Sequence, residues 1–169
     1  SIGYNVFIGC ENLKNVTIGT GIKTIDESVF YKCSSLTSIT IPNSVTYIGR
    51  NVFGDCTNLS SVTIGTGVTA IGKQAFNGCS SLTSITIPSS VTSIGYTAFA
   101  ECSSLKTITV KATTPPTLGF YAFRGCPITT IYVPAESVDA YKTADGITSD
   151  GGIKADGWKD YADKIKAIP

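Results

Sequence analysis

Six cysteines are the residues of this chain whose chemistry depends most on their spacing. Thiols can form disulfides, hold a metal ion or act as nucleophiles, and each use needs a different arrangement. No two of the six form a C-x-x-C pair, and the chain has no histidine that could complete a metal site or activate a thiol. They recur every 23 residues, with a last interval of 24: Cys10, Cys33, Cys56, Cys79, Cys102 and Cys126.

The fixed interval predicts that the six thiols occupy the same place in a repeated unit and point inward, one above another. In that arrangement neighbouring Cβ vectors are poorly placed for the dihedral angle that a disulfide needs. We therefore expect packed free thiols that fill the core. One or more disulfides, or a metal site, are the alternatives. The expectation is that the protein uses neither a metal nor a cofactor.

Catalysis needs combinations of residues that this sequence does not contain. Without histidine, neither a Ser-His-Asp nor a Cys-His centre can be assembled. The carboxylates offer no convincing acid and base pair either, and we interpret them as solvated surface. The sequence therefore predicts a protein that is not an enzyme.

Charge and hydropathy exclude further classes of protein. The net charge is +1, and charged residues make up 15% of the chain, so the sequence does not predict a partner that is nucleic acid or an anionic membrane. No apolar run approaches the length of a membrane span. The chain opens in the middle of a motif, which leads us to expect that its natural start, and any export signal, lie upstream.

Phenylalanine recurs at the same intervals as cysteine, 23 residues with a last interval of 24. The whole unit therefore repeats, and not one residue type alone. The unit is approximately L-x-x-I-x-I-P-x-S-V-x-x-I-G-x-x-A-F-x-x-C-x-x. Repeats of this length stack into solenoids, because a single unit cannot bury its own apolar face. We expect the phenylalanines to form the core: Phe7, Phe30, Phe53, Phe76, Phe99 and Phe123.

Each unit predicts three local structures. Residues 36–42 alternate β-branched and polar residues, which is typical of a strand with one buried side. A proline or glycine then ends the strand at a corner. A second, shorter extended edge follows around Val91 and Ile94, and the segment "AFAECSS" is expected to form a single helical or 3₁₀ turn.

The unit, nearly identical at 41–63 and 87–109, resembles the BspA-type leucine-rich repeat, also called the Treponema pallidum type, of bacterial surface proteins and some protists. The resemblance covers residues 1 to about 134. It implies a right-handed leucine-rich-repeat solenoid, mostly β with short helical turns, on an exported or surface-displayed protein. It further implies adhesion or binding of a host protein, although a fold does not fix a function.

Threonines form the first candidate binding surface, on the outward side of the main strand. Their column is Thr17, Thr40, Thr63, Thr86 and Thr109, and it ends in Tyr132. Such a flat hydroxyl face could bind a glycan or a protein, or order water as on ice-binding solenoids. The plainer interpretation is that threonine satisfies β propensity while keeping the surface soluble.

Aromatic residues outside the core form the second candidate surface. Tyr96 aligns with Phe120 one repeat later, and Tyr121 is adjacent. Tyrosines of this kind are favoured anchors at interfaces. The alternative is that the C-terminal tail covers them.

Residues 135–169 break the period and are expected to cap the sixth repeat. Short helices are predicted over 135–142 and 157–168, the second with Asp156 as its N-cap and Trp158, Tyr161, Ala162, Ile165 and Ile168 on one face. Residues 132–146 and 155–168 resemble the terminal segment of gut-bacterial BspA-type proteins, and the insert "ITSDGGIK" at 147–154 interrupts this resemblance. The loop around the insert carries Asp145, Asp150 and Asp156 among glycines. We interpret it as a surface turn, with a calcium site as the alternative.

Together these features predict six repeats over 1–134 and a capping segment over 135–169. The predicted function is a non-catalytic recognition module, extracellular or on a bacterial cell surface, that binds a host or matrix protein or a glycan. The alternative is a structural spacer in a larger surface protein, with no ligand of its own.

Overall fold

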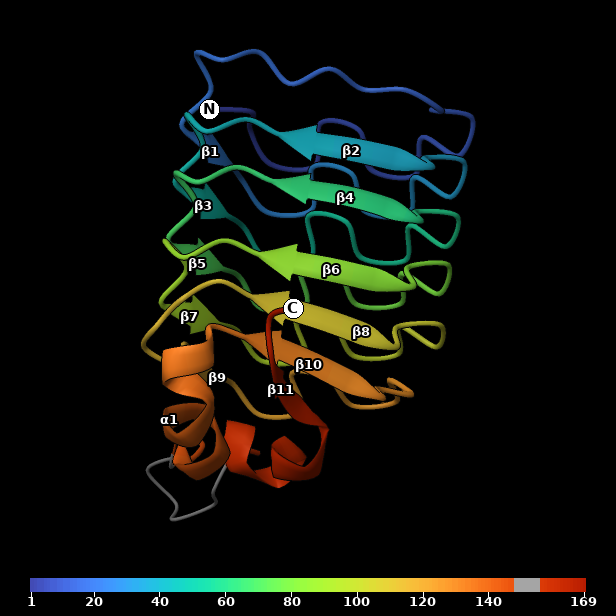
Figure 1. Ribbon diagram of the computed structural model, residues 1–169. Coiled ribbons are helices and arrows are strands. Elements are labelled where there is room, and N and C mark those ends of the chain that lie inside the picture. The colour runs from blue at the N-terminus through green and yellow to red at the C-terminus, as the bar shows by residue number, and fades with distance from the viewer. Residues whose placement is uncertain (148–155) are drawn as a thin grey trace.

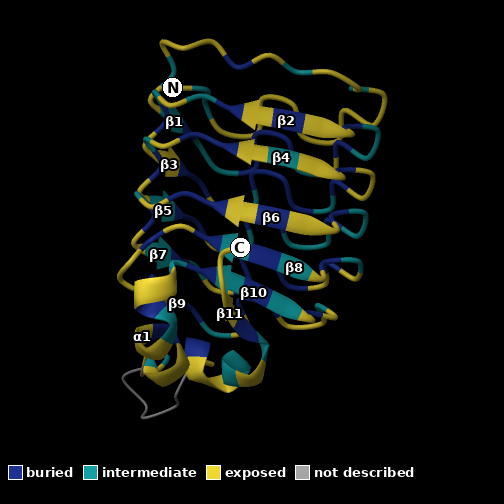
Figure 2. Cartoon of the chain, in the orientation of Figure 1, coloured by how far each residue is buried: buried dark blue, intermediate teal, exposed yellow. Residues whose placement is uncertain are grey.

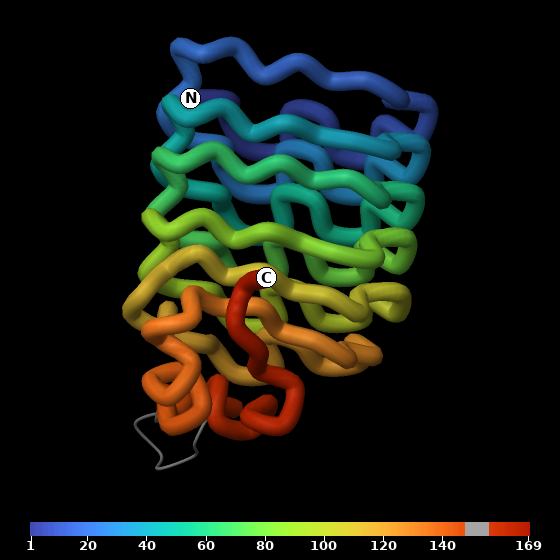
Figure 3. Tube along the Cα trace, viewed as in Figure 1, coloured from blue at the N-terminus to red at the C-terminus, as the bar shows by residue number. Residues whose placement is uncertain are grey.

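The computed structural model describes residues 1–147 and 156–169. Residues 2–134 form one coil whose turns stack along a single axis (Figures 1 and 3). We call each turn a rung and number them 1 to 6: residues 2–24, 25–47, 48–70, 71–93, 94–117 and 118–134. Figures 1 and 3 show rung 1 at one end of the stack and the C-terminal segment at the other. The chain is a leucine-rich-repeat solenoid, as its sequence predicts.

Long strands form one side of the stack. They are β2 (Ser38–Ile41), β4 (Ser61–Ile64), β6 (Ser84–Ile87), β8 (Thr107–Val110) and β10 (Thr130–Val133). Their apolar residues point inward and their hydroxyl residues outward, because successive side chains of a strand face opposite ways. Parallel pairing joins β2 to β4, and β6 to β8 to β10.

Short strands form a second, uninterrupted parallel sheet on another side of each rung (Figure 1). They are β1 (Thr24–Ile25), β3 (Tyr47–Ile48), β5 (Ala70–Ile71), β7 (Ser93–Ile94) and β9 (Thr117–Leu118). The isoleucine or leucine of each points into the core and is almost completely buried. This edge matches the predicted second extended segment.

The segment between the short strand and the cysteine differs from its prediction. It forms successive turns throughout the six rungs and not a helical or 3₁₀ turn. Two residues of each rung adopt a left-handed backbone conformation with positive φ. A right-handed helical turn needs negative φ at every residue, so these segments cannot be helical. The first such position, with φ between 46° and 59°, holds Asn5, Ser28, Asn51, Gln74, Thr97 and Tyr121. The second, with φ between 55° and 76°, holds Gly9, Lys32, Asp55, Gly78, Glu101 and Gly125.

A stack of phenylalanine rings runs through the core. Neighbouring rings in the column from Phe7 to Phe123 lie 5.1 to 5.5 Å apart with interplanar angles of 16° or less. All except Phe7 are buried, and Phe7 is 37% exposed because no ring covers it at the open end. Figure 2 shows the same contrast, with exposed residues gathered in rung 1. The predicted aromatic core is confirmed.

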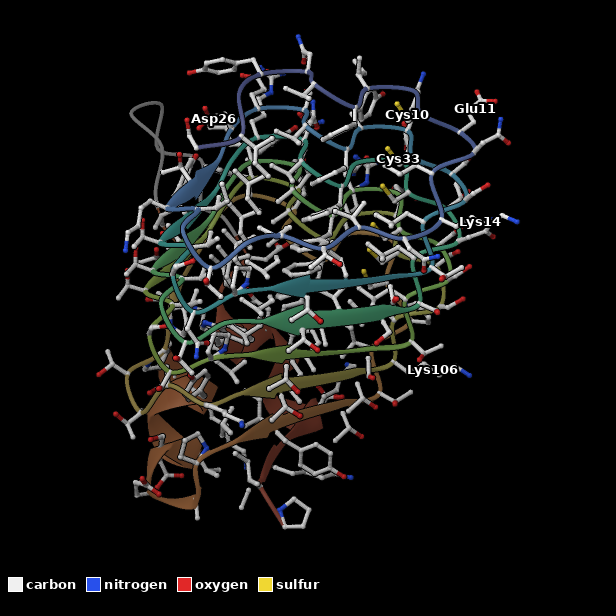
Figure 4. All side chains as sticks on the ribbon, turned by 90° about the horizontal axis from the view of Figure 1, so that it is seen from above. Cys10, Glu11, Lys14, Asp26, Cys33 and Lys106 are labelled. Carbon is white, nitrogen blue, oxygen red and sulfur yellow. The ribbon has the colours of Figure 1, made fainter. Side chains whose placement is uncertain are left out.

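The cysteine column is also internal except at Cys10, and the five later thiols have a hydrogen-bond partner that the sequence did not predict. From Cys33 onward, each Sγ donates to the carbonyl oxygen of the phenylalanine one rung earlier, at 3.0 to 3.2 Å. Figure 4, which looks down the stack, shows Cys10 and Cys33 at the same corner of their rungs, with Glu11 and Lys14 outside. All six thiols are free, Cys10 is exposed and Cys126 is half-buried.

Residues 135–147 and 156–169 close the last rung. A 3₁₀ turn η1 (Ala135–Ser137) leads into helix α1 (Val138–Thr143), close to the helix predicted over 135–142. The predicted helix over 157–168 is wrong: the chain forms a 3₁₀ element η2 (Trp158–Lys164) and then strand β11 (Ile165–Ala167). Strand β11 pairs in parallel with β10, because the open edge of β10 offers backbone partners that a helix could not satisfy.

The cap of η2 also differs from its prediction. Gly157 precedes η2, and its backbone N–H donates to the carboxylate of Asp160 at 2.7 Å, whereas Asp156 is exposed. Trp158 and Tyr141 are buried, and the Trp158 ring lies 5.9 Å from that of Phe123. The C-terminal segment thus ends the phenylalanine stack.

Candidate functional site

The hydroxyl face follows the outward side of the long strands. Strand register places Thr40 beside Thr63, Thr86 beside Thr109, and Thr109 beside Tyr132. Thr40, Thr63 and Thr86 are exposed, whereas Thr109 and Tyr132 are half-buried. The predicted column therefore exists, but its second half is shielded where the large Tyr132 side chain adjoins Thr109 and where β11 pairs with β10.

The three predicted aromatic residues come together at the other sheet. Each follows a short strand: Tyr96 follows β7, and Phe120 and Tyr121 follow β9. The Tyr121 ring lies 6.3 Å from Tyr96 in an edge-on arrangement and 6.5 Å from Phe120. Tyr96 and Tyr121 keep 44% and 45% of their surface exposed, so the part of the C-terminal segment that the structure describes does not cover their rings.

Tyr96 and Phe120 line a groove of about 410 Å³, which we call the aromatic groove. Its other walls come from Lys73 of rung 4, the hydroxyl residues Ser93 and Thr117, and Ile147. The groove therefore combines two aromatic rings with one ammonium group and two hydroxyls at its edge. Such a mixture of apolar wall and a few polar groups is typical of ligand sites.

The predicted site residues thus form two separate surfaces and not one. Tyr132 belongs to the hydroxyl face, while Tyr96 and Phe120 line the aromatic groove on the short-strand side and the Tyr121 ring lies beside it. Sequence reasoning missed the polar wall residues Lys73, Ser93 and Thr117, and also Ile147. Lys73 lies 23 residues before Tyr96 and so occupies the same position of the repeat one rung earlier. Alignment of the repeats could therefore have predicted that Lys73 is a neighbour of Tyr96. Ile147 lies outside the repeats, and no pattern pointed to it.

A second hollow, of about 450 Å³, lies at the corner of rung 5. It forms where this rung has one residue more than the others, and Lys111, Thr113 and Pro115 are among its walls. Two buried side chains of the C-terminal segment form hydrogen bonds with the backbone of this corner. Tyr141 Oη–H donates to the Ala112 carbonyl at 2.8 Å, and Trp158 Nε1–H donates to the Pro116 carbonyl at 2.6 Å. Its polar groups are hydroxyls and one lysine.

The buried thiols have little nucleophilic character. Burial raises the pKa of Cys33 to about 11 and that of Cys56 to about 12, and the pKa of Cys79 is raised well above its ordinary value by the same cause. A thiol is reactive as its thiolate, so these groups stay inert near neutral pH.

Acidic residues do not assemble a site in the part of the chain that the structure describes. Asp145 forms an ion pair with Lys159, Asp156 is exposed, and Asp150 lies outside the described residues. Among residues 1–147 and 156–169, no three cysteine or acidic side chains gather in a way that could hold a metal ion. In the same residues, no helix has the length and apolar composition that a membrane span requires.

Comparison with solved structures identifies relatives of the same architecture. A leucine-rich-repeat protein of T. pallidum, TpLRR, is 29% identical with a TM-score of 0.64, and the match covers 70% of this chain and 54% of that one. A leucine-rich-repeat protein from Bacteroides ovatus is 24% identical with a TM-score of 0.57, over 98% of this chain and 54% of that one. The pneumococcal vaccine antigen PcpA is 16% identical with a TM-score of 0.56, over 86% and 40%.

The chain spans about half the length of the first two of these relatives. No curated protein matches it. Its sequence matches the family described as the BspA type leucine rich repeat region in six copies, over residues 1–106 and 23–144. The protein therefore belongs to the BspA-type leucine-rich-repeat family.

Proposed function

We propose that this protein is a non-catalytic recognition module, displayed outside a bacterial cell, that binds an extracellular protein or glycan. The observation that carries the proposal is the aromatic groove lined by Tyr96 and the half-buried Phe120, with Tyr121 beside it; Tyr96 and Tyr121 keep nearly half of their surface in solvent. The complete absence of histidine supports a role without catalysis. The surface location rests on membership of the BspA-type family.

The chemistry of the groove suits a ligand that offers both an apolar face and hydroxyl or amide groups. Exposed tyrosine rings provide contact area with little conformational entropy to lose, which makes them frequent anchors of binding energy. Ser93 and Thr117 supply hydroxyls that can donate or accept, and Lys73 supplies a donor. Sugars and extended polypeptides both present this combination.

The hydroxyl face is the second candidate surface of the proposal. Thr40, Thr63 and Thr86 offer hydrogen bonds but no apolar anchor, so this face would extend a contact and not start one. If it also binds, charges placed on it should weaken capture less than loss of the groove rings.

A structural spacer is the alternative function, and the continuous phenylalanine stack favours it. Five consecutive ring contacts make a rod of uniform repeat, which is what a stalk requires. If the chain is a spacer, it should capture no protein or glycan. A capture experiment therefore distinguishes the two functions.

The test is capture of extracellular-matrix proteins and arrayed glycans by the purified chain. The groove variant Tyr96→Ser, Phe120→Ser, Tyr121→Ser should lose capture at least about tenfold while its melting temperature stays within a few degrees. Tyr47→Ser is the matched control, since Tyr47 is 43% exposed on the same sheet but outside the groove. Absence of any capture by the unchanged chain would favour the spacer.

A further inference from the structure

Two hollows of the molecule adjoin each other: the aromatic groove and the hollow at the corner of rung 5, which we call the corner hollow. Thr117 of β9 lines both of them. One rung earlier, Thr92 lines the corner hollow and the next residue, Ser93 of β7, lines the groove. Strands β7 and β9 are paired neighbours at the end of the short-strand sheet nearest the C-terminal segment (Figure 1). The two hollows, of about 410 and about 450 Å³, therefore form one tract that passes over the Thr117 side chain.

The groove part of this tract has a floor without side chains. Gly95 and Gly119 form the floor. A Cβ at Gly95 would lie 2.7 Å from the backbone nitrogen of Lys73, and a Cβ at Gly119 would collide with the backbone of the preceding rung, so both positions require glycine. In each rung a hydroxyl residue precedes the glycine by two positions and an aromatic residue follows it directly: Ser93 and Tyr96, and Thr117 and Phe120. Hydroxyls and rings thus flank the floor, which suits a sugar ring with its apolar face and its hydroxyl edge.

The hydroxyl groups of the tract can act both as acceptors and as donors. Thr92 Oγ1–H already donates to the Thr69 carbonyl at 3.2 Å, and Thr117 Oγ1–H to the Thr92 carbonyl at 3.4 Å, so these two groups offer only oxygen lone pairs. Thr113 and Thr114 are exposed, and their hydroxyls have no hydrogen-bond partner among the described residues, so they can also donate. Sugar hydroxyls donate and accept in the same way, and a glycan can therefore use all of these groups.

Positive charge is present in both hollows. Lys111 lines the corner hollow, and Lys73 lines the groove at the repeat position that Tyr96 occupies one rung later. Both lysines are exposed, neither forms an ion pair with another described residue, and no described acidic residue lines either hollow. Arg50, at the same repeat position one rung before Lys73, differs because it pairs with Glu27 at 3.7 Å. Two uncompensated ammonium groups thus favour an anionic ligand.

The sheet geometry makes an extended peptide a poor occupant of the tract. Such peptides add to a sheet along the open edge of a strand, where unpaired N–H and C=O groups remain. The groove lies instead on the face of the short-strand sheet, and β7 pairs with β5 on one side and with β9 on the other. The backbone groups of β7 are therefore already paired, and a ligand must be recognised through side chains.

We propose that the tract binds an acidic oligosaccharide, whose sugar rings lie against Tyr96 and Phe120 and whose carboxylates pair with Lys73 and Lys111. The inference rests on the proposed function and narrows its ligand from a protein or glycan to a glycan that carries negative charge. Each exposed ion pair contributes little alone. The ligand must therefore span both hollows and combine the two charges with the ring and hydroxyl contacts.

The test is titration of the purified chain, at low ionic strength, with the hexasaccharides of hyaluronan and of polygalacturonic acid. Each is compared with its methyl ester, which keeps the sugar rings and removes the charge. At least one acid should bind, with a Kd at least about tenfold lower than that of its ester. Lys73→Gln and Lys111→Gln should each raise the Kd of the acid about threefold or more and leave that of the ester unchanged.

Arg50→Gln is the matched control, since it removes the same charge at the same repeat position but outside both hollows. All three side chains are exposed, so the melting temperatures of the variants should stay within a few degrees of the unchanged chain. Equal losses in Arg50→Gln and Lys73→Gln, equal Kd values for acid and ester, or no binding of either acid would overturn the proposal. So would hexaglutamate that binds as tightly as the acids, because an acidic peptide would then be the ligand.

The failure of this inference is distinguishable from the failure of the proposed function. If the acids do not bind but the chain captures a neutral glycan or a matrix protein through Tyr96 and Phe120, the recognition role stands and only the acidic ligand is wrong. If the chain captures nothing at all, the recognition role itself is wrong.

Discussion

The thiol of Cys79 donates a hydrogen bond to the carbonyl oxygen of Phe53, one rung earlier, at 3.2 Å. The same carbonyl accepts the backbone N–H of Cys56, also at 3.2 Å. One phenylalanine carbonyl thus joins the turn of its own rung to the side chain of the next. The cysteine column therefore contributes a directional contact between rungs as well as apolar volume.

Removing one of these thiols should weaken the stack by a limited amount. Cys79→Ala loses one hydrogen bond and leaves a small cavity, so the free energy of unfolding should fall by about 1 to 2 kcal/mol. The loss is limited because the Phe53 carbonyl keeps its second donor. Chemical denaturation measures it, and Cys10→Ala is the control that should change nothing, because Cys10 is exposed. Equal losses at both positions would refute the role of the thiol contact.

Stability should decrease at high pH because the buried thiols resist ionisation. In the unfolded chain these thiols titrate near pH 9, whereas burial raises the pKa of Cys33 to about 11 and of Cys56 to about 12 in the folded chain. The unfolded state therefore releases protons first, so the contribution of these thiols to stability is constant below pH 8 and is lost between pH 9 and 12. Melting temperatures measured across this range check it. Cys33→Ala and Cys56→Ala should flatten the decline, and an unchanged slope would contradict its assignment to the thiols.

Thr97 carries a strain that a substitution should relieve. It holds a β-branched side chain at φ +46°, and its buried hydroxyl has no hydrogen-bond partner among the described residues. Asn51 occupies the same place two rungs earlier with φ +53°, and asparagine tolerates left-handed backbone better than threonine. Thr97→Asn should stabilise the protein by about 1 kcal/mol. Thr92→Asn, at an exposed position, is the control, and destabilisation by Thr97→Asn would show that the backbone strain is negligible.

The C-terminal segment should be essential to stability through Trp158. This residue is 1% exposed, contacts the Phe123 and Tyr141 rings, and donates Nε1–H to the Pro116 carbonyl. Trp158→Ala should cost about 3 to 5 kcal/mol, and Trp158→Phe less, since it keeps most of the ring packing. A thermal scan of both variants measures the difference. Little loss in Trp158→Ala would mean that rung 6 does not need this cover.

The internal columns could be predicted because a constant place in a repeat fixes a constant environment. Phe53, Phe76 and Phe99 share one interval, and the structure stacks their rings as expected. The left-handed turns were missed, although Asn51 and Gly78 at those positions are residues that favour left-handed backbone. A helical turn was predicted instead, on the short length of the segment alone.

The structure of residues 157–168 could not be predicted from their own sequence. Trp158, Tyr161 and Ile165 have helical spacing, but Ile165 pairs with Ile131 in the last strand. Residues 165–167 form a strand because the backbone N–H and C=O groups at the outer edge of β10 need hydrogen-bond partners. That edge exists only after the rungs have stacked. Similarly, the separation of Tyr132 from Tyr96 depends on which side of the coil each strand occupies, which residue spacing does not specify.

The most direct test of the proposed recognition role is a footprint of the bound ligand. Amide hydrogen exchange of the chain should be measured with and without the captured protein or glycan. We predict that slowed exchange is concentrated at Gly95–Thr97 and Gly119–Tyr121, beside the aromatic groove. Slowed exchange on the hydroxyl face at Thr40, Thr63 and Thr86, with none at the groove, would contradict it.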